Sequence, residues 1–260
     1  MLDWRAFTND PNNREAIKQM DAFFRSITRV EAISRREMVV EFGRGLEVLD
    51  IGAAGHVAQH QLGGWEHGLI KQAAKRAVAV DINKDNVDHY NGMGFDFRHA
   101  DATSDIDLGE RFDRIFIGDV IEHVNDPVLL LQFAQRHLKP DGRILVTTPN
   151  PFSPRFRLHR RQRGQRYVMA NLEHTRWLSV STMHELVWRA GLKMTALRWP
   201  LMKKPKTGLS RDVALLAKKA HLAIAPLEEV FNEYAFELAN RTESRSPAYV
   251  GTERASAQNS

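Results

Sequence analysis

The chain has 260 residues, of which 43% are hydrophobic and 27% are charged, a balance that is ordinary for a globular protein and argues against disorder. It contains no cysteine, which excludes disulfides, thiolate metal sites and a cysteine nucleophile. No stretch approaches the roughly 18 apolar residues of a membrane-spanning helix, and the N-terminal sequence lacks the apolar run of a signal peptide. We therefore expect a cytoplasmic protein.

Positive charge is unevenly distributed along the chain, whose formal net charge is +5. The segment from Arg155 to Arg166 contains six arginines and no acidic residue, and Lys203, Lys204 and Lys206 follow later. Two interpretations are open. The segment is either a solvated basic loop or a docking surface for phosphate-bearing molecules or an anionic membrane face.

Hydrophobic spacing predicts helices that alternate with strands. Apolar residues recur at helical spacing over residues 12–42, which predicts an N-terminal helical segment. Short apolar runs that are typical of strands follow at 46–51, 77–81, 95–99, 112–117, 143–148 and 192–199. Helices are expected between them, including one that begins at Pro127 and one over 181–190 that ends at Gly191. This alternation predicts a parallel sheet.

The C-terminal part has a less regular pattern. Residues 210–223 indicate an amphipathic helix with a basic side, residues 231–238 fit either a strand or a helix, and the polar tail from residue 243 is expected to be disordered. We therefore divide the chain into an N-terminal helical cap (1–44), a main domain (45–241) with a helical insertion at 201–230, and a flexible tail (242–260).

Three consecutive predicted strands end in residues suited to a nucleoside ligand. The first runs through Asp50 into the turn Gly52-Ala53-Ala54-Gly55, where backbone N–H groups can approach a ligand closely. The second ends at Asp81, whose carboxylate can accept both hydroxyls of a ribose, and the third at Asp101, which can accept from an adenine amino group. The turn lacks the three-glycine spacing that a pyrophosphate prefers, which disfavours a nicotinamide dehydrogenase.

These segments, in this order, resemble the class I S-adenosylmethionine-dependent methyltransferases. The motifs that carry the resemblance are Val48-Leu49-Asp50-Ile51-Gly52, Val80-Asp81, Asp101-Ala102, Gly118-Asp119-Val120-Ile121-Glu122-His123-Val124 and Leu138-Lys139-Pro140-Asp141-Gly142. The resemblance implies an α/β, Rossmann-like fold for residues 45–241. Its seven-stranded sheet would be mostly parallel with an antiparallel last strand and have helices on both faces, joined by the N-terminal helices and the helical insertion near the C-terminus.

The resemblance also implies S-adenosylmethionine as the cofactor. The residues expected to contact it are Asp50, Gly52, Ala53, Gly55, Asp81, Ile82, Asp101, Ala102, Gly118 and Asp119. Ala54 and His56 stand where the family has glycines, so the turn carries additional bulk near the cofactor. Trp65 is interpreted as a core residue.

The segment Asp119 to His123 carries the candidate catalytic groups. His123 is suited to take a proton from an attacking hydroxyl, and Glu122 or Asp119 would orient its imidazole. Alternatively, Asp119, Glu122 and His123 are ligands of a divalent metal, as in similar ubiquinone-pathway O-methyltransferases, although a metal is not favoured. In a third interpretation His123 has a structural role in the loop before Pro127.

Two later segments resemble a bacterial branch of the superfamily associated with polysaccharide and other secondary pathways. In that branch a Thr-Thr-Pro-Asn strand end and a downstream His…Trp pair close the acceptor side of the pocket. Asn150 and His174 are therefore expected to bind the acceptor, with His174 as an alternative base or else a loop histidine bound to backbone. Arg160 and Arg161 would bind a phosphate-bearing acceptor.

The favoured prediction is O-methylation of a sugar, a glycan end or another small molecule. The first alternative is metal-assisted O-methylation of a phenolic or quinone precursor. A second is an RNA-binding or RNA-modifying protein, suggested by the pI near 9.5, but the chain has no recognisable RNA module, so a nucleic-acid partner is not favoured. A third is a protein whose degenerate methyltransferase fold serves only for binding and catalyses no reaction. Peripheral contact with an anionic membrane stays open, and the sequence predicts no oligomeric state.

Overall fold

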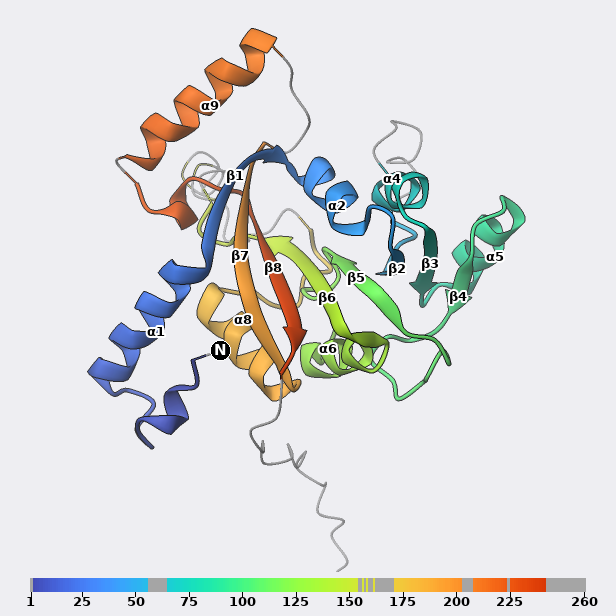
Figure 1. The fold of residues 1–260 in the computed structure, drawn as a ribbon, viewed down its shortest axis with the longest axis horizontal. Helices are drawn as coiled ribbons and strands as arrows, with labels where there is room; N and C mark the ends of the chain where they lie inside the picture. The colour runs from blue at the N-terminus through green and yellow to red at the C-terminus, as the bar shows by residue number, and fades with distance from the viewer. Residues whose placement is uncertain are drawn as a thin grey trace, which may run out of the picture.

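The computed structural model describes residues 2–55, 65–153, 156, 158, 161, 171–202, 208–223 and 225–241. Within these residues, eight strands form one sheet in the order β1-β7-β8-β6-β5-β2-β3-β4 (Figure 1). Neighbouring strands are parallel, except that β8 is antiparallel to both β6 and β7. The predicted mostly parallel sheet with an antiparallel last strand is therefore confirmed.

The strands have the following bounds: β1 Thr28–Ser34, β2 Glu47–Ile51, β3 Arg76–Asp81, β4 Phe97–His99, β5 Phe112–Gly118, β6 Leu138–Pro149, β7 Leu192–Met202 and β8 Glu233–Asn240. The α-helices are α1 Arg14–Ile27, α2 Arg35–Gly43, α4 Glu66–Ala73, α5 Lys84–Gly92, α6 Pro127–Arg136, α8 Val180–Arg189 and α9 Gly208–Leu222. Short 3-10 helices cover Trp4–Ala6 and Leu227–Glu229. Residues 231–238, which fitted either a strand or a helix, lie largely in β8.

The seven-strand prediction is wrong by one strand, because β1 interrupts the helix expected over residues 12–42. Thr28 ends α1 in an extended conformation, and its hydroxyl donates to the carbonyl of Phe24 (2.7 Å). The side chain of Ser34 then caps α2 together with Glu37. The residues between them pair in parallel with β7. Val30 and Ile33 are three residues apart, a spacing that fits a helix, so the sequence periodicity predicted a helix where the chain pairs with β7.

Helices cover both faces of the sheet. On one face, α6 and α8 pack against β2, β3, β5 and β6 in the largest core cluster, which includes Leu130, Phe133, Met183, Ile115 and Val146. On the other face, α2 and α4 cover β2, β5 and β6 through Met38, Val39 and Ile70, and α5 covers β3 and β4. The alternation of side chains along each strand produces this three-layer arrangement.

The carboxyl ends of the parallel strands meet at one edge of the sheet. The segments that follow β2, β3, β5, β6 and β7 all leave the sheet there, and β8 begins at the same edge with Glu233. Open α/β sheets bind their ligands at this edge. Among the described residues, no helix is both long and apolar enough to cross a bilayer.

Candidate methyl-transfer site

The glycine-rich turn after β2 is held by the carboxylate at the end of β3. Asp81 Oδ2 accepts the N–H of Ala54 (3.1 Å), and Oδ1 accepts the N–H of Asn83 (2.9 Å). Gly52 has a φ of +74°, and a Cβ at this position would collide with the side chain of Val120. Since a carboxylate has about four acceptor positions, Asp81 can hold the turn and still accept ribose hydroxyls.

A cavity of about 780 Å³ opens beside this turn, at the carboxyl edge of the sheet. Among the predicted cofactor residues, those that line it are Asp50, Gly52, Ala53, Gly55, Asp81, Ile82, Gly118 and Asp119. Asp101 and Ala102 are not part of the described lining. The Asp101 carboxylate is exposed and accepts hydrogen bonds from the N–H and hydroxyl of Thr103 (2.8 and 2.7 Å). Ile82, at 67% exposure, presents an open apolar surface beside the Asp81 carboxylate.

Arg35 is a cavity residue that the sequence did not reveal. It lies buried in the first turn of α2, and its guanidinium joins three carboxylates from distant parts of the chain. Nη1 lies 2.7 Å from Asp119 and 2.8 Å from Glu233, and Nη2 lies 3.0 Å from Glu66. Burial opposes the charge on Arg35, but these carboxylates outweigh it and raise the pKa of Arg35 further.

The three partners leave this buried cluster with more negative than positive charge. Burial raises the pKa of Glu66, and Arg35 only partly counters that effect. The lining residues Asp50 and Asp81 add further carboxylates. A cavity lined by these carboxylates suits a ligand that carries positive charge and disfavours a pyrophosphate. S-adenosylmethionine, which carries a sulfonium and an ammonium group, fits this donor set.

Trp65 and His67, on either side of the start of α4, also line the cavity. Trp65 was interpreted as a core residue; it stacks on Tyr90, but its indole N–H donates to the carbonyl of Ala53 in the turn (2.7 Å). Burial raises the pKa of Asp50, and the hydrogen bond between His67 Nδ1 and Asp50 Oδ2 (2.9 Å) partly opposes that effect. Trp65 and His67 therefore hold the end of β2 and the glycine-rich turn that follows it.

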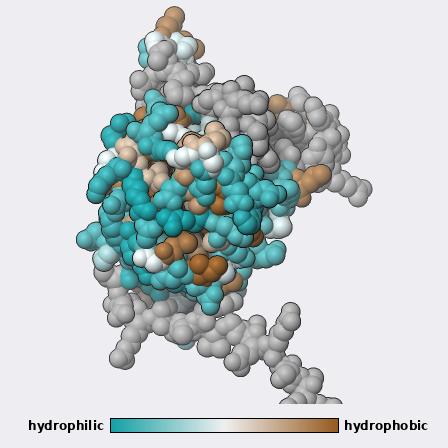
Figure 2. Space-filling view, turned by 90° about the vertical axis from the view of Figure 1, so that its right-hand side faces the viewer, coloured by the Kyte–Doolittle hydropathy of each residue, from teal (hydrophilic) through white to brown (hydrophobic). Residues whose placement is uncertain are grey.

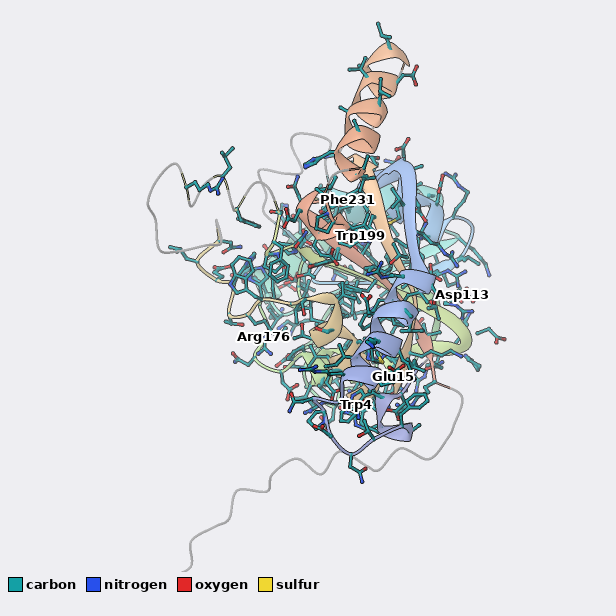
Figure 3. The ribbon with its side chains drawn as sticks, turned by 90° about the vertical axis from the view of Figure 1, so that its left-hand side faces the viewer. Trp4, Glu15, Asp113, Arg176, Trp199 and Phe231 are labelled. Carbon is teal, nitrogen blue, oxygen red and sulfur yellow. The ribbon has the colours of Figure 1, made fainter. Side chains whose placement is uncertain are left out.

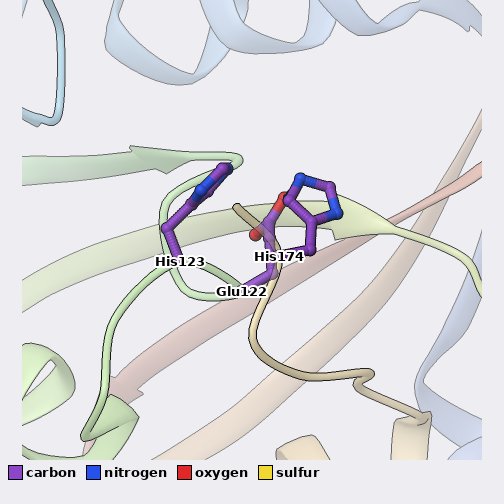
Figure 4. Close-up of side chains that lie close together, drawn as sticks. All are labelled: Glu122, His123 and His174. Atoms are coloured by element: carbon purple, nitrogen blue, oxygen red, sulfur yellow. The ribbon is translucent and has the colours of Figure 1, made fainter. Parts of the chain in front are cut away.

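Three ionisable side chains meet where the cavity borders the loop after β5. They are Glu122, His123 and His174 (Figure 4), and one potential ligand atom from each lies within 4.8 Å of the others. The two imidazole rings meet edge to face with their centres 4.6 Å apart. His174 Nε2 lies 3.9 Å from Glu122 Oε1, while His123 lines the cavity itself.

Hydrogen bonds to backbone carbonyls hold the segments around residues 122 and 174 together. The N–H and the hydroxyl of Thr175 both donate to the carbonyl of Glu122 (3.0 and 3.1 Å), and Arg176 donates to the carbonyl of Asn125. The hydroxyl of Thr148, on the neighbouring strand β6, donates to Glu122 Oε2 (3.0 Å). The cluster is thus fixed by a strand and by a loop that is distant in sequence.

The electrostatics of the cluster favour the neutral forms of Glu122 and His174. Burial, with a further contribution from the Asp119 charge, raises the pKa of Glu122 to about 8. Burial and the nearby His123 lower the pKa of His174. Glu122 Oε1 and His174 Nδ1 are buried without a hydrogen-bond partner among the described residues. Unpaired buried polar atoms are uncommon, and they mark a site that a proton, an ion or a substrate can complete.

Comparison with known proteins identifies the family. The sequence profile of the family described as "Methyltransferase domain" matches residues 17–197, which is more than half of the chain. The chain belongs to this family. The resemblance to the class I S-adenosylmethionine-dependent methyltransferases is thereby confirmed, together with S-adenosylmethionine as the cofactor.

Two curated relatives of this methyltransferase carry the same name. The ubiquinone biosynthesis O-methyltransferase of Dinoroseobacter shibae is 29% identical over 134 residues, which cover 44% of this chain and 49% of the relative. The protein of the same name from Azorhizobium caulinodans is 31% identical over 161 residues, covering 59% of this chain and 61% of the relative. The matches thus span about half to three fifths of these relatives.

A solved structure of low sequence identity shares the methyltransferase fold. It is a chain of the complex between the Haloferax volcanii Trm112 methyltransferase activator and a methyltransferase. The identity is 14%, the match covers 88% of this chain and 94% of that chain, and the TM-score is 0.52.

The acceptor-binding role expected for Asn150 in this methyltransferase is wrong. Its side chain is completely buried, and its amide nitrogen donates to the carbonyls of Glu228 (2.6 Å) and Phe231 (2.8 Å). Its side-chain oxygen accepts the N–H of Phe152 (2.9 Å). Asn150 therefore ties the end of β6 to the segment before β8. Arg161 is exposed, and Arg160 lies outside the described residues.

Asp119 also differs from its predicted role as a metal ligand. Its φ of +53° lies in the left-handed region, and its carboxylate binds Arg35 and accepts from the hydroxyl of Thr147 (3.3 Å). His174 stands closer to Glu122 and His123 as the third ligand atom. Since these contacts cross between elements, no local motif in the sequence indicated them.

Proposed function

We propose that this methyltransferase transfers the methyl group of S-adenosylmethionine to an oxygen of a phenolic or quinone-precursor acceptor. The observation that carries the proposal is the cluster of Glu122, His123 and His174 at the border of the cofactor cavity. The names of the curated relatives, at about 30% identity, favour an aromatic acceptor over the sugar or glycan that was favoured from the sequence. The family match supports S-adenosylmethionine as the methyl donor.

The chemistry of an imidazole base agrees with a phenolic acceptor. Methyl transfer from a sulfonium is a direct displacement, so the protein must align the nucleophile and remove its proton. A phenol has a pKa of about 10, much closer to the range of histidine than that of an aliphatic hydroxyl, which is nearer to the value of about 16 for water. His123, which lines the cavity, would take the proton. Neutral His174, whose ring meets that of His123 edge to face, would be the next acceptor of the proton.

A metal-assisted form of the same reaction is the second candidate, and the geometry of the cluster supports it. One carboxylate and two imidazoles within 4.8 Å form a ligand set that suits Zn²⁺, Fe²⁺ or Mn²⁺ better than Mg²⁺. The unpartnered Glu122 Oε1 and His174 Nδ1 lie in this cluster. A bound ion would supply Lewis acidity that lowers the pKa of a coordinated hydroxyl.

Turnover of an acceptor panel tests the proposal. The chain would be incubated with methyl-labelled S-adenosylmethionine and with catechols, simple phenols and nucleotide sugars, before and after treatment with a strong chelator. We expect methylation of the phenols alone, and the same rate after chelation. A loss of activity that Zn²⁺ or Mn²⁺ restores would transfer the role of His123 to a metal-bound group. Methylation of sugars but not of phenols would contradict the proposal.

A further inference from the structure

Strand β1 forms one edge of the sheet. Among the described residues it pairs with β7 only, and its outer side faces the viewer in Figure 3, between α1 and α9. Very short strands and prolines are two common ways in which proteins protect such an edge. The opposite edge strand, β4, has only three residues, and Figure 2 shows a mostly hydrophilic surface on that side. By contrast, β1 has seven residues and no proline.

The backbone of Val30, in the middle of β1, points out of the sheet. Val30 stands opposite Trp199 in the parallel ladder. If its backbone faced β7, its carbonyl would need the N–H of the next residue, Pro200, which has none. Arg29 and Glu31 therefore turn their backbone groups towards β7, and the N–H and C=O of Val30 face outward. No described residue outside the sheet forms a backbone hydrogen bond with them.

The two side chains that flank Val30 carry opposite charges on one face of the sheet. Glu31 is partly buried and accepts two hydrogen bonds from Arg198 (both 2.8 Å). Arg29 is exposed, has no ion-pair partner among the described residues, and stands opposite Arg198 in the ladder. Like charges at directly opposite positions destabilise a pair of strands. Arg29 thus lacks a carboxylate that would balance its charge.

We propose that two copies of this chain pair through β1, in antiparallel orientation about a two-fold axis at Val30. In this register, Val30 of each copy donates its N–H to the carbonyl of Val30 in the other copy. Arg29 and Glu31 each lie one residue from the axis, so Arg29 of one copy stands opposite Glu31 of the other. The edge strands then join the two sheets into one.

The side chains of β1 suit this register. Positions 29 and 31 form the non-hydrogen-bonded pairs of the new ladder, in which opposite side chains lie closest together. Glu31 can bind the second arginine while it keeps Arg198, because a carboxylate has about four acceptor positions. Val30 is 43% exposed, and the Val30 side chains of the two copies would cover each other. A second copy carries this pattern of charges by symmetry, which favours it over an unrelated strand.

Pairing through β1 acts next to the cofactor cavity. The strand ends at Ser34, whose side chain caps α2, and the first residue of α2 is Arg35 in the cavity wall. A second copy would thus hold the strand from which α2 begins. The pairing does not depend on the identity of the methyl acceptor, because the oligomeric state is measured without turnover.

Sedimentation velocity of the whole chain over a range of concentrations tests the proposal. We expect a dimer for the wild type and a monomer for Val30→Pro. Proline is tolerated on an edge strand where the missing N–H faces outward, so this change removes the new hydrogen bonds and leaves the ladder with β7 intact. The matched control is Val30→Thr, which keeps the N–H and a β-branched side chain and is expected to remain a dimer.

Exchanging the charges tests the register. Arg29→Glu and Glu31→Arg each place like charges opposite one another in a pair of identical copies, so each is expected to weaken pairing by about tenfold or more. When the two variants are mixed, every contact at these positions again joins opposite charges, and a mixed dimer is expected. Lys84→Glu, the same change of charge at an exposed position on α5, should leave pairing unchanged.

A wild type that stays monomeric at every concentration would overturn the proposal. A dimer that Val30→Pro and Arg29→Glu leave unchanged would also overturn it, because such a dimer would use another surface. Calorimetric binding of S-adenosylhomocysteine shows that each variant is folded, since positions 29–31 lie outside the described cavity lining. Charge variants that bind this ligand but fail to pair when mixed would contradict the antiparallel register.

Discussion

Replacing Glu122 with glutamine is expected to stabilise the chain in alkaline solution. Glu122 is only 1% exposed, and its burial raises the pKa from the ordinary value of 4.5 to about 8. Between these two pH values the unfolded chain releases the proton while the folded chain keeps it. The contribution of Glu122 to stability is therefore fully present below about pH 4.5 and is lost as the pH rises towards 8.

The size of this decline follows from the two pKa values. The difference between 4.5 and about 8 corresponds to about 5 kcal/mol, at about 1.4 kcal/mol for each tenfold change in proton affinity. Glutamine has nearly the same shape and keeps an oxygen that accepts from the hydroxyl of Thr148, but it does not ionise. The variant should therefore lose about 4 kcal/mol less stability than the wild type between about pH 5 and pH 9.

Urea unfolding at several pH values measures this difference directly. Glu173→Gln is the matched control, because Glu173 lies near the same cluster but its side chain is 77% exposed, and its replacement should leave the pH dependence unchanged. Saturating Zn²⁺ adds a second readout, since an ion bound by Glu122 would hold the carboxylate ionised and remove most of the decline in the wild type. Parallel stability curves for the wild type and Glu122→Gln without metal would refute the reasoning.

Three further substitutions test the cavity. Asp81→Ala should weaken S-adenosylhomocysteine binding by about 2–3 kcal/mol, the scale of hydrogen bonds to a charged group, and unchanged affinity in calorimetry would remove Asp81 from the site. Arg35→Met should cost about 3–5 kcal/mol of unfolding free energy by leaving three carboxylates without their cation, and a cost below about 1 kcal/mol would show that water compensates them. Gly52→Ala should cost about 1–3 kcal/mol and abolish cofactor binding, because it strains a left-handed position and meets Val120; a folded variant with normal affinity would contradict this.

The parts of the fold that local pattern controls were predicted from the sequence. The ends of β2, β3 and β5 carry Gly52, Asp81 and Gly118, and a parallel sheet brings such ends to one edge whatever the details of packing. Helix α6 was equally evident, because Asp126 caps it and Pro127 occupies its first turn. In both cases the residues that determine the structure lie within a few positions of it.

The parts that depend on distant contacts were not predicted. Strand β1 exists because β7 pairs with it, and Arg35 is significant because Glu66, Asp119 and Glu233 surround it. Hydrogen bonds from Thr175 and Arg176 to the loop after β5 hold His174 beside Glu122. Each of these contacts joins segments that are separated by many residues, and a single sequence contains no periodic signal for such pairs.

The role of His123 as the base that activates a phenolic hydroxyl is tested most directly with acceptors of different acidity. Turnover numbers would be measured at neutral pH for an ordinary phenol and for a nitrophenol that is already largely ionised, with the wild type and with His123→Ala. Removing a positioned base is expected to reduce kcat for the ordinary phenol by about 10²–10⁴, and much less for the ionised acceptor, which has no proton to give. An equal loss for both phenols would contradict the assignment of His123 as the base.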